Sequence, residues 1–430
     1  MYDLAIIGGG PAGYSAALEG VRLGLRMILF EKDQLGGTCL NRGCVPTKFL
    51  SHVAKIRTEM DIAIENGISF TETQIDFYKT MARKAEIISS LRNGLTQQML
   101  QKKIKVIQGT ASIKEKNRIS CNGTDFETKN ILIATGAVPI KPFISKAISS
   151  DKLLELDEIP RNLHILGGGP VAVEFASIFC ALGSDVTISI RGERILQKWD
   201  KEIAVNLTQS MKQKGIRIQT KTNFETLQIE NDAVILSAMG RIPNLEGLNN
   251  TYFDIGPHNG IITDTFGRTK VSGIFAAGDV VDGSHQLAHI GMEQGRQVAR
   301  WIAGVAVTKP SAIVKTIIAS QEIASVGLTE QEAKNKGIRV ITAKQNLYSN
   351  ARTMIVTKER GFIKVVADLE TKKIIGAQLI CERAGDIVAE LALAINHNLS
   401  LEDMLVSIRP HPSYCEAITD VMMLLLEKMR

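Results

Sequence analysis

The feature that most constrains this chain is a pattern of strand, glycine turn, helix and strand that occurs twice. The first copy lies within residues 4–30 and the second within residues 163–190, each with two apolar runs flanking a helical periodicity. A parallel βαβ unit with a glycine-rich first turn is typical of a dinucleotide-binding fold. Beyond about residue 307 the pattern changes to mixed strands and helices. We therefore predict an α/β chain with two Rossmann-like domains and a C-terminal α+β domain.

Three domains follow from this pattern. We expect one dinucleotide-binding domain over residues 1–145 and 271–306, a second over 146–270, and a C-terminal domain over 307–430. A chain of 430 residues is long enough for all three. In the last of them, Thr329 and Glu332 form a capping-box signature for a helix start.

Composition excludes several classes of protein. The chain has 51 Lys plus Arg against 45 Asp plus Glu, a net charge of +6 without any basic block, so nucleic acid is not an expected partner. No apolar run approaches the about 18 residues of a membrane span, and the start MYDLAIIGGG lacks the basic region of a secretory signal. We expect a cytoplasmic protein that binds neither a membrane nor a metal ion.

The first glycine loop has the residues needed to hold a pyrophosphate. In Gly8-x-Gly10-x-x-Gly13, the first glycine makes the tight turn, the second lets the backbone approach the phosphates, and the third lets helix and strand pack closely. The phosphates then meet the unpaired N–H groups at the helix start. Glu31 ends the following strand, where its carboxylate can accept hydrogen bonds from a ribose diol.

Two of the six cysteines stand five residues apart in the segment GGTCLNRGCVPTK. Cys39 and Cys44 lie in an open helical turn, where two thiols can form a disulfide if their Cβ vectors converge. The electropositive start of a helix also lowers the pKa of a thiol. Three others are interpreted as packing residues and one as a spectator, namely Cys121, Cys180, Cys381 and Cys415.

This segment resembles the redox-active disulfide of the class I pyridine nucleotide-disulfide oxidoreductases, and the resemblance covers essentially the whole chain. It implies a homodimeric enzyme with FAD in the first site and NAD or NADP in the second. It also implies that Cys39 exchanges with the substrate, while Cys44 lies against the flavin as a thiolate. By the same resemblance Lys48 lies near the reactive edge of the flavin, with Glu174 as its partner.

Further cofactor contacts rest on the resemblance alone. The aspartate of the stretch GIFAAGDV holds the flavin ribityl chain in such enzymes, and the triplet ATG forms a loop at the edge of the first domain. The residues that match these and the remaining cofactor-contacting positions are Asp279, Thr135, Gly136, Gly240, Ala288 and His289. We expect His289 to contact the flavin through its backbone and not to carry a proton.

The C-terminal segment Arg-Pro-His-Pro-Ser-Tyr-Cys-Glu resembles the His-Pro-x-x-x-Glu motif of the family. A histidine side chain suits the proton transfer that thiol–disulfide exchange needs, and the carboxylate of Glu416 can fix the tautomer of His411. The resemblance suggests a cis bond before Pro412 and places the histidine in the active site of the other subunit. The catalytic site would then exist only in a two-fold dimer.

The second glycine loop leaves the choice of nicotinamide nucleotide open. Gly167, Gly169 and Ala172 form its fingerprint, but the strand that follows ends in Ile190-Arg191. NAD-specific members of the family carry an acidic residue there, and NADPH-using members carry arginine. An arginine at about 4 Å from a 2′-phosphate contributes roughly 1–4 kcal/mol, unless Arg191 is simply solvated.

Within the family the chain is most similar to the dihydrolipoyl dehydrogenases, judged by the sequences of residues 38–44 and 322–329. This suggests a dithiol or disulfide substrate, and the resemblance offers a lipoyl domain of a multienzyme complex as the partner that would carry it. The alternative is an NADPH-dependent reductase of a low-molecular-weight disulfide, favoured by Arg191. A scaffold subunit would not need the intact cysteine pair and histidine dyad, and a flavin monooxygenase or NADH oxidase would not need both cysteines.

Overall fold

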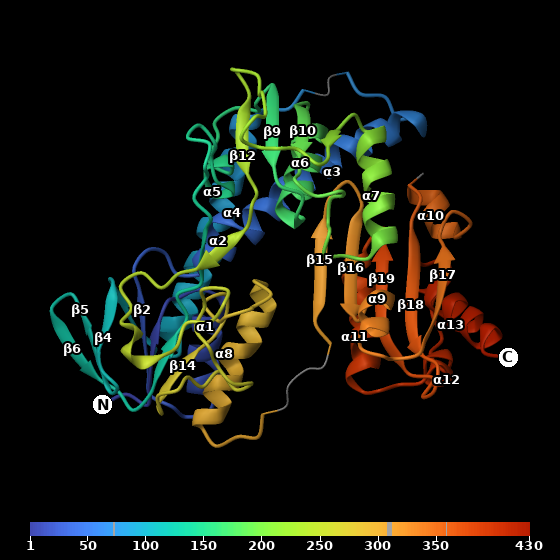
Figure 1. Ribbon diagram of the computed structural model, residues 1–430. Helices are drawn as coiled ribbons and strands as arrows, with labels where there is room; N and C mark the ends of the chain where they lie inside the picture. The colour runs from blue at the N-terminus through green and yellow to red at the C-terminus, as the bar shows by residue number, and fades with distance from the viewer. Residues whose placement is uncertain (72–73, 308–311, 358) are drawn as a thin grey trace.

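The chain folds into two Rossmann-like units and a C-terminal α+β unit, as the sequence predicts (Figure 1). The computed structural model describes residues 1–71, 74–307, 312–357 and 359–430. In the described residues, no helix is long and apolar enough to cross a membrane.

The first unit is built on a parallel sheet with the strand order β14-β7-β1-β2-β3. Its strands are β1 (Leu4–Ile7), β2 (Met27–Glu31), β3 (Lys105–Gln108), β7 (Ile131–Ile133) and β14 (Ile274–Ala276). Its helices are α1 (Pro11–Arg22), α2 (Gly37–Arg42), α3 (Cys44–Glu65), α4 (Phe77–Gln101) and α8 (Ala288–Ile302). Helices α1 and α8 pack so closely that a Cβ on Gly295 would lie 2.1 Å from the Ala12 oxygen. A small antiparallel sheet consists of β4 (Ala111–Glu115), β5 (Arg118–Cys121) and β6 (Thr124–Glu127).

The second unit repeats the arrangement with the parallel strand order β11-β10-β9-β12. Its strands are β9 (Asn162–Leu166), β10 (Asp185–Ser189), β11 (Arg217–Gln219) and β12 (Val234–Ser237). Its helices are α5 (Ser150–Leu153), α6 (Pro170–Ala181) and α7 (Lys201–Gln213), and a 3-10 turn, η1, covers Asn250–Tyr252. An antiparallel pair, β8 (Ala137–Pro139) with β13 (Arg241–Pro243), connects the two units.

The C-terminal unit is an antiparallel sheet with the order β15-β16-β19-β18-β17. Its strands are β15 (Val314–Ile318), β16 (Glu322–Gly327), β17 (Val340–Asn346), β18 (Phe362–Asp368) and β19 (Ile374–Ile380). Its helices are α9 (Glu330–Asn335), α10 (Ala351–Val356), α11 (Ala384–Asn396), α12 (Leu401–Leu405) and α13 (Glu416–Lys428). The predicted capping box is present, because Thr329 and Glu332 exchange hydrogen bonds at the start of α9.

The second and C-terminal units share a hydrophobic core, and in Figure 1 helix α7 stands beside the C-terminal sheet. Leu207 and Met211 of α7 belong to the same buried cluster as Ile323, Phe362 and Ile380 of that sheet. Burial of apolar surface between the units therefore holds the second unit against the C-terminal unit.

Some predicted elements begin or end elsewhere. The polar, amphipathic pattern of residues 71–103 predicts one or two helices. Of this stretch, α4 covers Phe77–Gln101, and Asp76 caps it by accepting from the Lys79 N–H at 3.0 Å. Residues 72–73 of that stretch lie outside the described residues. The helix expected around the cysteine pair is two helices, because Gly43 has φ −140° and ψ −107° and interrupts it.

Candidate active site

The first glycine loop fits closely against the end of β7. Gly8 has φ +106°, and a Cβ there would lie 2.3 Å from the Ala134 oxygen, so no other residue fits this turn. A Cβ on Gly13 would lie 1.9 Å from the Gly8 oxygen, which explains the close packing of α1 on β1. At Gly10 a Cβ would meet nothing nearer than 3.8 Å, and no side chain caps the start of α1. Free space and open N–H groups thus lie where phosphates would bind.

Glu31 is tied to this loop at the end of β2. Its Oε2 accepts a hydrogen bond from the Gly9 N–H at 2.6 Å, and its Oε1 accepts from the Asp33 N–H at 2.8 Å. Burial raises the pKa of the Glu31 carboxyl, although the Gly9 N–H opposes this. The carboxyl group is therefore held at the edge of the loop.

Thr135, Gly136 and Gly240 lie where the two nucleotide folds are joined. The Thr135 hydroxyl donates to the Asn244 oxygen at 2.7 Å, and the Asn244 N–H donates to the Gly136 oxygen at 2.8 Å. Gly240 has φ +107°, and its oxygen accepts from the Ile140 N–H at 3.1 Å. Much of the hydrogen-bonding capacity of this loop is therefore used to connect the units.

Asp279 follows β14 close to the cysteine pair. Burial raises the pKa of its carboxyl, and the charge of Arg241 opposes this. Ala288 and His289 open α8, and His289 Nε2 lies 2.9 Å from the Val314 oxygen of β15. The His289 ring is thus engaged with the C-terminal unit.

The two cysteines lie at the junction of α2 and α3, where they are free thiols. A hydrogen bond from Cys39 lowers the pKa of Cys44, and the nearby Lys48 ammonium lowers it further. The same contact and burial raise the pKa of Cys39. Cys44 is also the first residue of α3, where the helix dipole favours a thiolate. Cys44 is therefore the more acidic thiol of the pair.

Lys48 and Glu174 form an ion pair across two units, although they are 126 residues apart. Lys48 Nζ lies 2.5 Å from Glu174 Oε1, and this oxygen also accepts from the Ile318 N–H at 2.8 Å. Helices α3 and α6 and strand β15 thus meet at one carboxylate beside Cys44.

One residue near the thiols was not expected from the sequence. Burial raises the pKa of Tyr14, and the thiols of Cys39 and Cys44 raise it further while Arg296 opposes this. The signal in the sequence was its position directly after Gly13, at the start of α1.

His411 and Glu416 form the expected contact, with His411 Nδ1 2.8 Å from Glu416 Oε2 and a cis His411–Pro412 bond. Glu416 Oε1 accepts from Asn350 Nδ2 at 3.0 Å, an unexpected partner between β17 and α10. The same amide donates to the Ser413 oxygen at 3.0 Å. Asn350 therefore orients the carboxylate that orients the imidazole.

Within the described residues of one chain, the dyad and the cysteine pair are not brought together. The groups that perturb the thiol pKa values are Lys48, Glu174 and Asp279, and no histidine is among them. The His411 side chain is instead 75% exposed.

The second glycine loop has the same backbone geometry as the first. Gly167 has φ +119°, and a Cβ there would lie 2.4 Å from the Ala238 oxygen. A Cβ on Gly169 would meet nothing within 4 Å, and no side chain caps α6. Ala172 is fully buried in the third position. This loop too leaves room and open N–H groups for a phosphate.

Arg191 lies over two aromatic rings at the rim of this loop. Its guanidinium carbon is 4.9 Å from the ring centre of Phe224 and 5.8 Å from that of Phe143. The two rings are stacked with their centres 6.0 Å apart. A cation over an aromatic face is attracted by the ring quadrupole, so the exposed Arg191 side chain lies against these two rings.

Comparison with known proteins gives consistent matches. The family model "Pyridine nucleotide-disulphide oxidoreductase" matches residues 2–295, and the model of its dimerisation domain matches residues 313–422. The chain is 33% identical to dihydrolipoyl dehydrogenase of Mycoplasma pneumoniae, covering 98% of this chain and 97% of that one. It is 34% identical to the Geobacillus stearothermophilus enzyme of that name, covering 96% and 94%. Among solved structures, the HOCl-induced flavoprotein disulfide reductase RclA of Escherichia coli is similar, with a TM-score of 0.88 at 27% identity over 99% and 100% of the chains.

Proposed function

Because this chain belongs to the pyridine nucleotide-disulphide oxidoreductase family, we propose that it is a dihydrolipoyl dehydrogenase. Membership implies an oxidoreductase that uses FAD and a pyridine nucleotide, and the dimerisation-domain match indicates a homodimer. The observation that carries the proposal is the Cys39–Cys44 thiol pair beside Lys48 and Glu174. The names of several relatives support the dithiol substrate.

We assign FAD to the domain of residues 1–145 and 271–306, the pyridine nucleotide to 146–270 and dimerisation to 307–430. The residues present fit FAD, because Gly10 leaves open space beside an uncapped helix start and Asp279 has a carboxyl group without a hydrogen bond to any described residue. Glu31 would face the ribose, and Lys48 and the start of α8 at Ala288 would face the ring system. When bound, FAD supplies two-electron chemistry between the nicotinamide and the cysteine pair.

The thiols would exchange with substrate in two balanced steps. In the reducing direction, the Cys39 thiolate attacks a substrate disulfide, which forms a mixed disulfide and releases one substrate thiolate. Cys44 then attacks the Cys39 sulfur, which closes the Cys39–Cys44 disulfide and releases the second thiolate. Oxidation of a dithiol is the reverse sequence. The lowered pKa of Cys44 favours the thiolate that this second step needs.

Proton transfer would fall to His411 of the partner subunit. In reduction it donates a proton to the leaving substrate thiolate, and in oxidation it accepts one from the dithiol. Glu416, held by Asn350, keeps the imidazole oriented. The exposure of His411 and its separation from the thiols within one chain support a site shared between subunits.

A second candidate function is an NADPH-dependent reductase of a low-molecular-weight disulfide. The observation in its favour is Arg191, which lies over Phe143 and Phe224 with no acidic residue in the place that Glu31 has in the first unit. A guanidinium there suits a 2′-phosphate.

The test is steady-state turnover with lipoamide and dihydrolipoamide, using NAD(H) and NADP(H) at matched concentrations. Strong turnover with NAD(H) supports the first candidate, and thiol turnover with NADP(H) alone supports the second. Cys39→Ser and Cys44→Ser should each lower turnover by roughly a thousandfold or more while FAD stays bound, and Cys180→Ser in α6 is the matched control. Full turnover of Cys44→Ser would contradict both candidates.

A further inference from the structure

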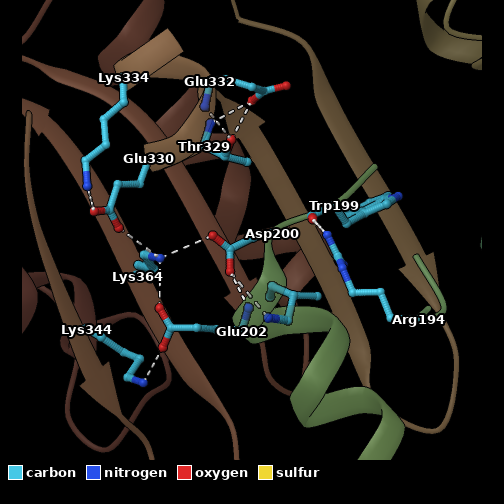
Figure 2. A network of polar contacts seen from close by, with 11 residues as sticks. Arg194, Trp199, Asp200, Glu202, Thr329, Glu330, Glu332, Lys334, Lys344 and Lys364 are labelled. Carbon is cyan, nitrogen blue, oxygen red and sulfur yellow. Dashed lines mark hydrogen bonds and ion pairs between the residues drawn. The ribbon is translucent and has the colours of Figure 1, made fainter. Parts of the chain in front are cut away.

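A cluster of charged side chains joins the second nucleotide-binding unit to the C-terminal sheet (Figure 2). At its centre is Lys364 of β18, whose Nζ lies 2.8 Å from Glu202 Oε1, 3.2 Å from Asp200 Oδ2 and 3.6 Å from Glu330 Oε2. The side chains of Lys364 and Asp200 are each only 7% exposed. Lys344 pairs with Glu202 at the margin of the cluster, at 2.5 Å.

The burial of Lys364 makes this cluster different from a surface ion pair. Moving charges out of water is costly, so a buried ion pair contributes little net stability, but removing one partner leaves an unpaired buried charge. Burial acts to lower the pKa of Lys364, yet its carboxylate partners raise it above the ordinary value. The ammonium group therefore stays charged and keeps its partners in place.

Asp200 links this cluster to the start of α7. Its Oδ2 contacts Lys364, while its Oδ1 accepts from the Glu202 N–H at 2.8 Å and the Ile203 N–H at 3.4 Å. One carboxylate thus caps the helix and binds the C-terminal sheet. Asp200 directly follows the segment 190–199, which runs from β10 to α7.

The segment 190–199 rests directly on the second glycine loop. The Leu196 N–H donates to the Gly168 oxygen at 2.7 Å. The Arg194 guanidinium stiffens the segment by donating to three of its carbonyl oxygens, including that of Trp199 at 3.0 Å. Figure 2 shows Arg194 pointing toward Trp199. A shift of Asp200 would therefore be transmitted to Gly168 and to Arg191 at the start of the segment.

We propose that Lys364 is a positioning residue for pyridine nucleotide binding, which acts through Asp200 on the segment 190–199 and on the glycine loop beneath it. The C-terminal sheet then sets the nucleotide affinity of a domain that it does not belong to. This inference rests on the proposed assignment of the second glycine loop to the pyridine nucleotide.

The experiment compares Lys364→Met with the wild-type FAD-loaded protein. We measure the Kd of the oxidised protein for NAD⁺ and NADP⁺ by calorimetry, together with the KM for the reduced nucleotide, kcat, FAD content and Tm. Coupling through packed elements commonly amounts to about three- to thirtyfold in affinity. We expect Kd and KM to rise by that factor while kcat changes by less than about twofold and FAD content stays the same.

Lys214→Met is the matched control, because Lys214 also forms an ion pair between α7 and the C-terminal unit. Its Nζ lies 2.5 Å from Glu359 Oε1, but at the end of α7 remote from the glycine loop, and its side chain is 35% exposed. Asp200→Asn is the second variant, because an asparagine keeps the helix cap and loses the charge that holds Lys364. If Lys364→Met does not fold, the Kd of Asp200→Asn for the nucleotide tests the proposal in its place.

The proposal predicts weaker nucleotide binding in Lys364→Met and Asp200→Asn, and unchanged binding in Lys214→Met. A fall in Tm with unchanged Kd in the first two variants would overturn it, since the cluster would then be only structural. Equal weakening in Lys214→Met would also overturn it. A wild-type protein that binds neither NAD⁺ nor NADP⁺ would instead contradict the nucleotide assignment.

Discussion

The two glycine loops of this chain can be compared atom by atom at the end of the strand that follows each of them. In the first unit, Glu31 accepts a hydrogen bond from the Gly9 N–H at 2.6 Å. In the second, a Cβ on Gly168 would lie 2.7 Å from Ile190 Cγ2, so an apolar side chain occupies the place of the carboxylate. Arg191 follows Ile190 in the chain, as Lys32 follows Glu31. The backbone of the two loops is alike, and the side chain that meets the middle glycine differs between them.

The largest effects should come from the first glycine of each loop. Gly8→Ala and Gly167→Ala would place a Cβ 2.3 Å and 2.4 Å from a carbonyl oxygen at positive φ. Each should lower the free energy of unfolding by about 3 kcal/mol or more. Urea denaturation of both variants measures this.

Gly10→Ala and Gly169→Ala are the matched controls, because a Cβ there has room within the protein. Both should remain folded, with FAD binding weakened in the first and NAD(P) binding in the second. If all four variants show the same loss in free energy of unfolding, the glycines are needed for packing alone and the two loops do not differ in ligand.

A smaller effect is expected from Arg191→Glu, which reverses the charge beside the second loop. The ratio of kcat/KM for NADPH over NADH should fall by about ten- to a hundredfold, because the 2′-phosphate loses a cation and meets an anion. Lys198→Glu, a nearby exposed charge reversal, is the control. An unchanged ratio in Arg191→Glu would leave Arg191 without a role in nucleotide choice.

Phe143→Ala tests whether the aromatic rings hold Arg191 in place. Loss of one cation–π contact of about 0.5–1 kcal/mol should reduce the NADPH preference by about two- to fivefold. Phe126→Ala, which removes a ring beside Lys105 in the first unit, should leave the ratio unchanged. An effect equal to that of Arg191→Glu would show that the ring itself contacts the nucleotide.

The smallest effect is a pH dependence confined to the first loop. Burial raises the pKa of Glu31 above its ordinary value of 4.5, so its stabilising contribution is present below that pH and is lost as the pH rises through the raised pKa. In denaturation experiments without FAD, the free energy of unfolding of Glu31→Gln should therefore rise relative to that of the wild type as the pH rises from about 4.5. Ile190→Val at the matching place should show a difference from the wild type that does not depend on pH.

Much of the fold could be predicted from local patterns. Short-range periodicity and glycine spacing predicted both βαβ units, and the Thr329–Glu332 capping box was found as expected. The break at Gly43 was missed, since nothing in the residue types distinguishes one helix from two across a glycine. Strand β10 ends one residue before Ile190, within the ordinary uncertainty of a strand end.

The residues of the candidate site also divide into those predicted from the sequence and those found only in the structure. The C-x4-C segment and the His-Pro-x-x-x-Glu segment were recognised because their residues are neighbours in the chain. Tyr14 and Asn350 were missed, because each reaches the site only through the packing of its own element against a distant one.

By itself the sequence determined the two glycine-rich turns, the thiol pair and the imidazole–carboxylate dyad, because each depends on the geometry of a few consecutive residues. Only the tertiary structure decided that Lys48 meets Glu174, that Arg191 rests on Phe143 and Phe224, and that Lys364 holds Asp200. These contacts join residues up to 164 positions apart. Their geometry comes from the shared core between units, which buries many side chains at once and which no local pattern encodes.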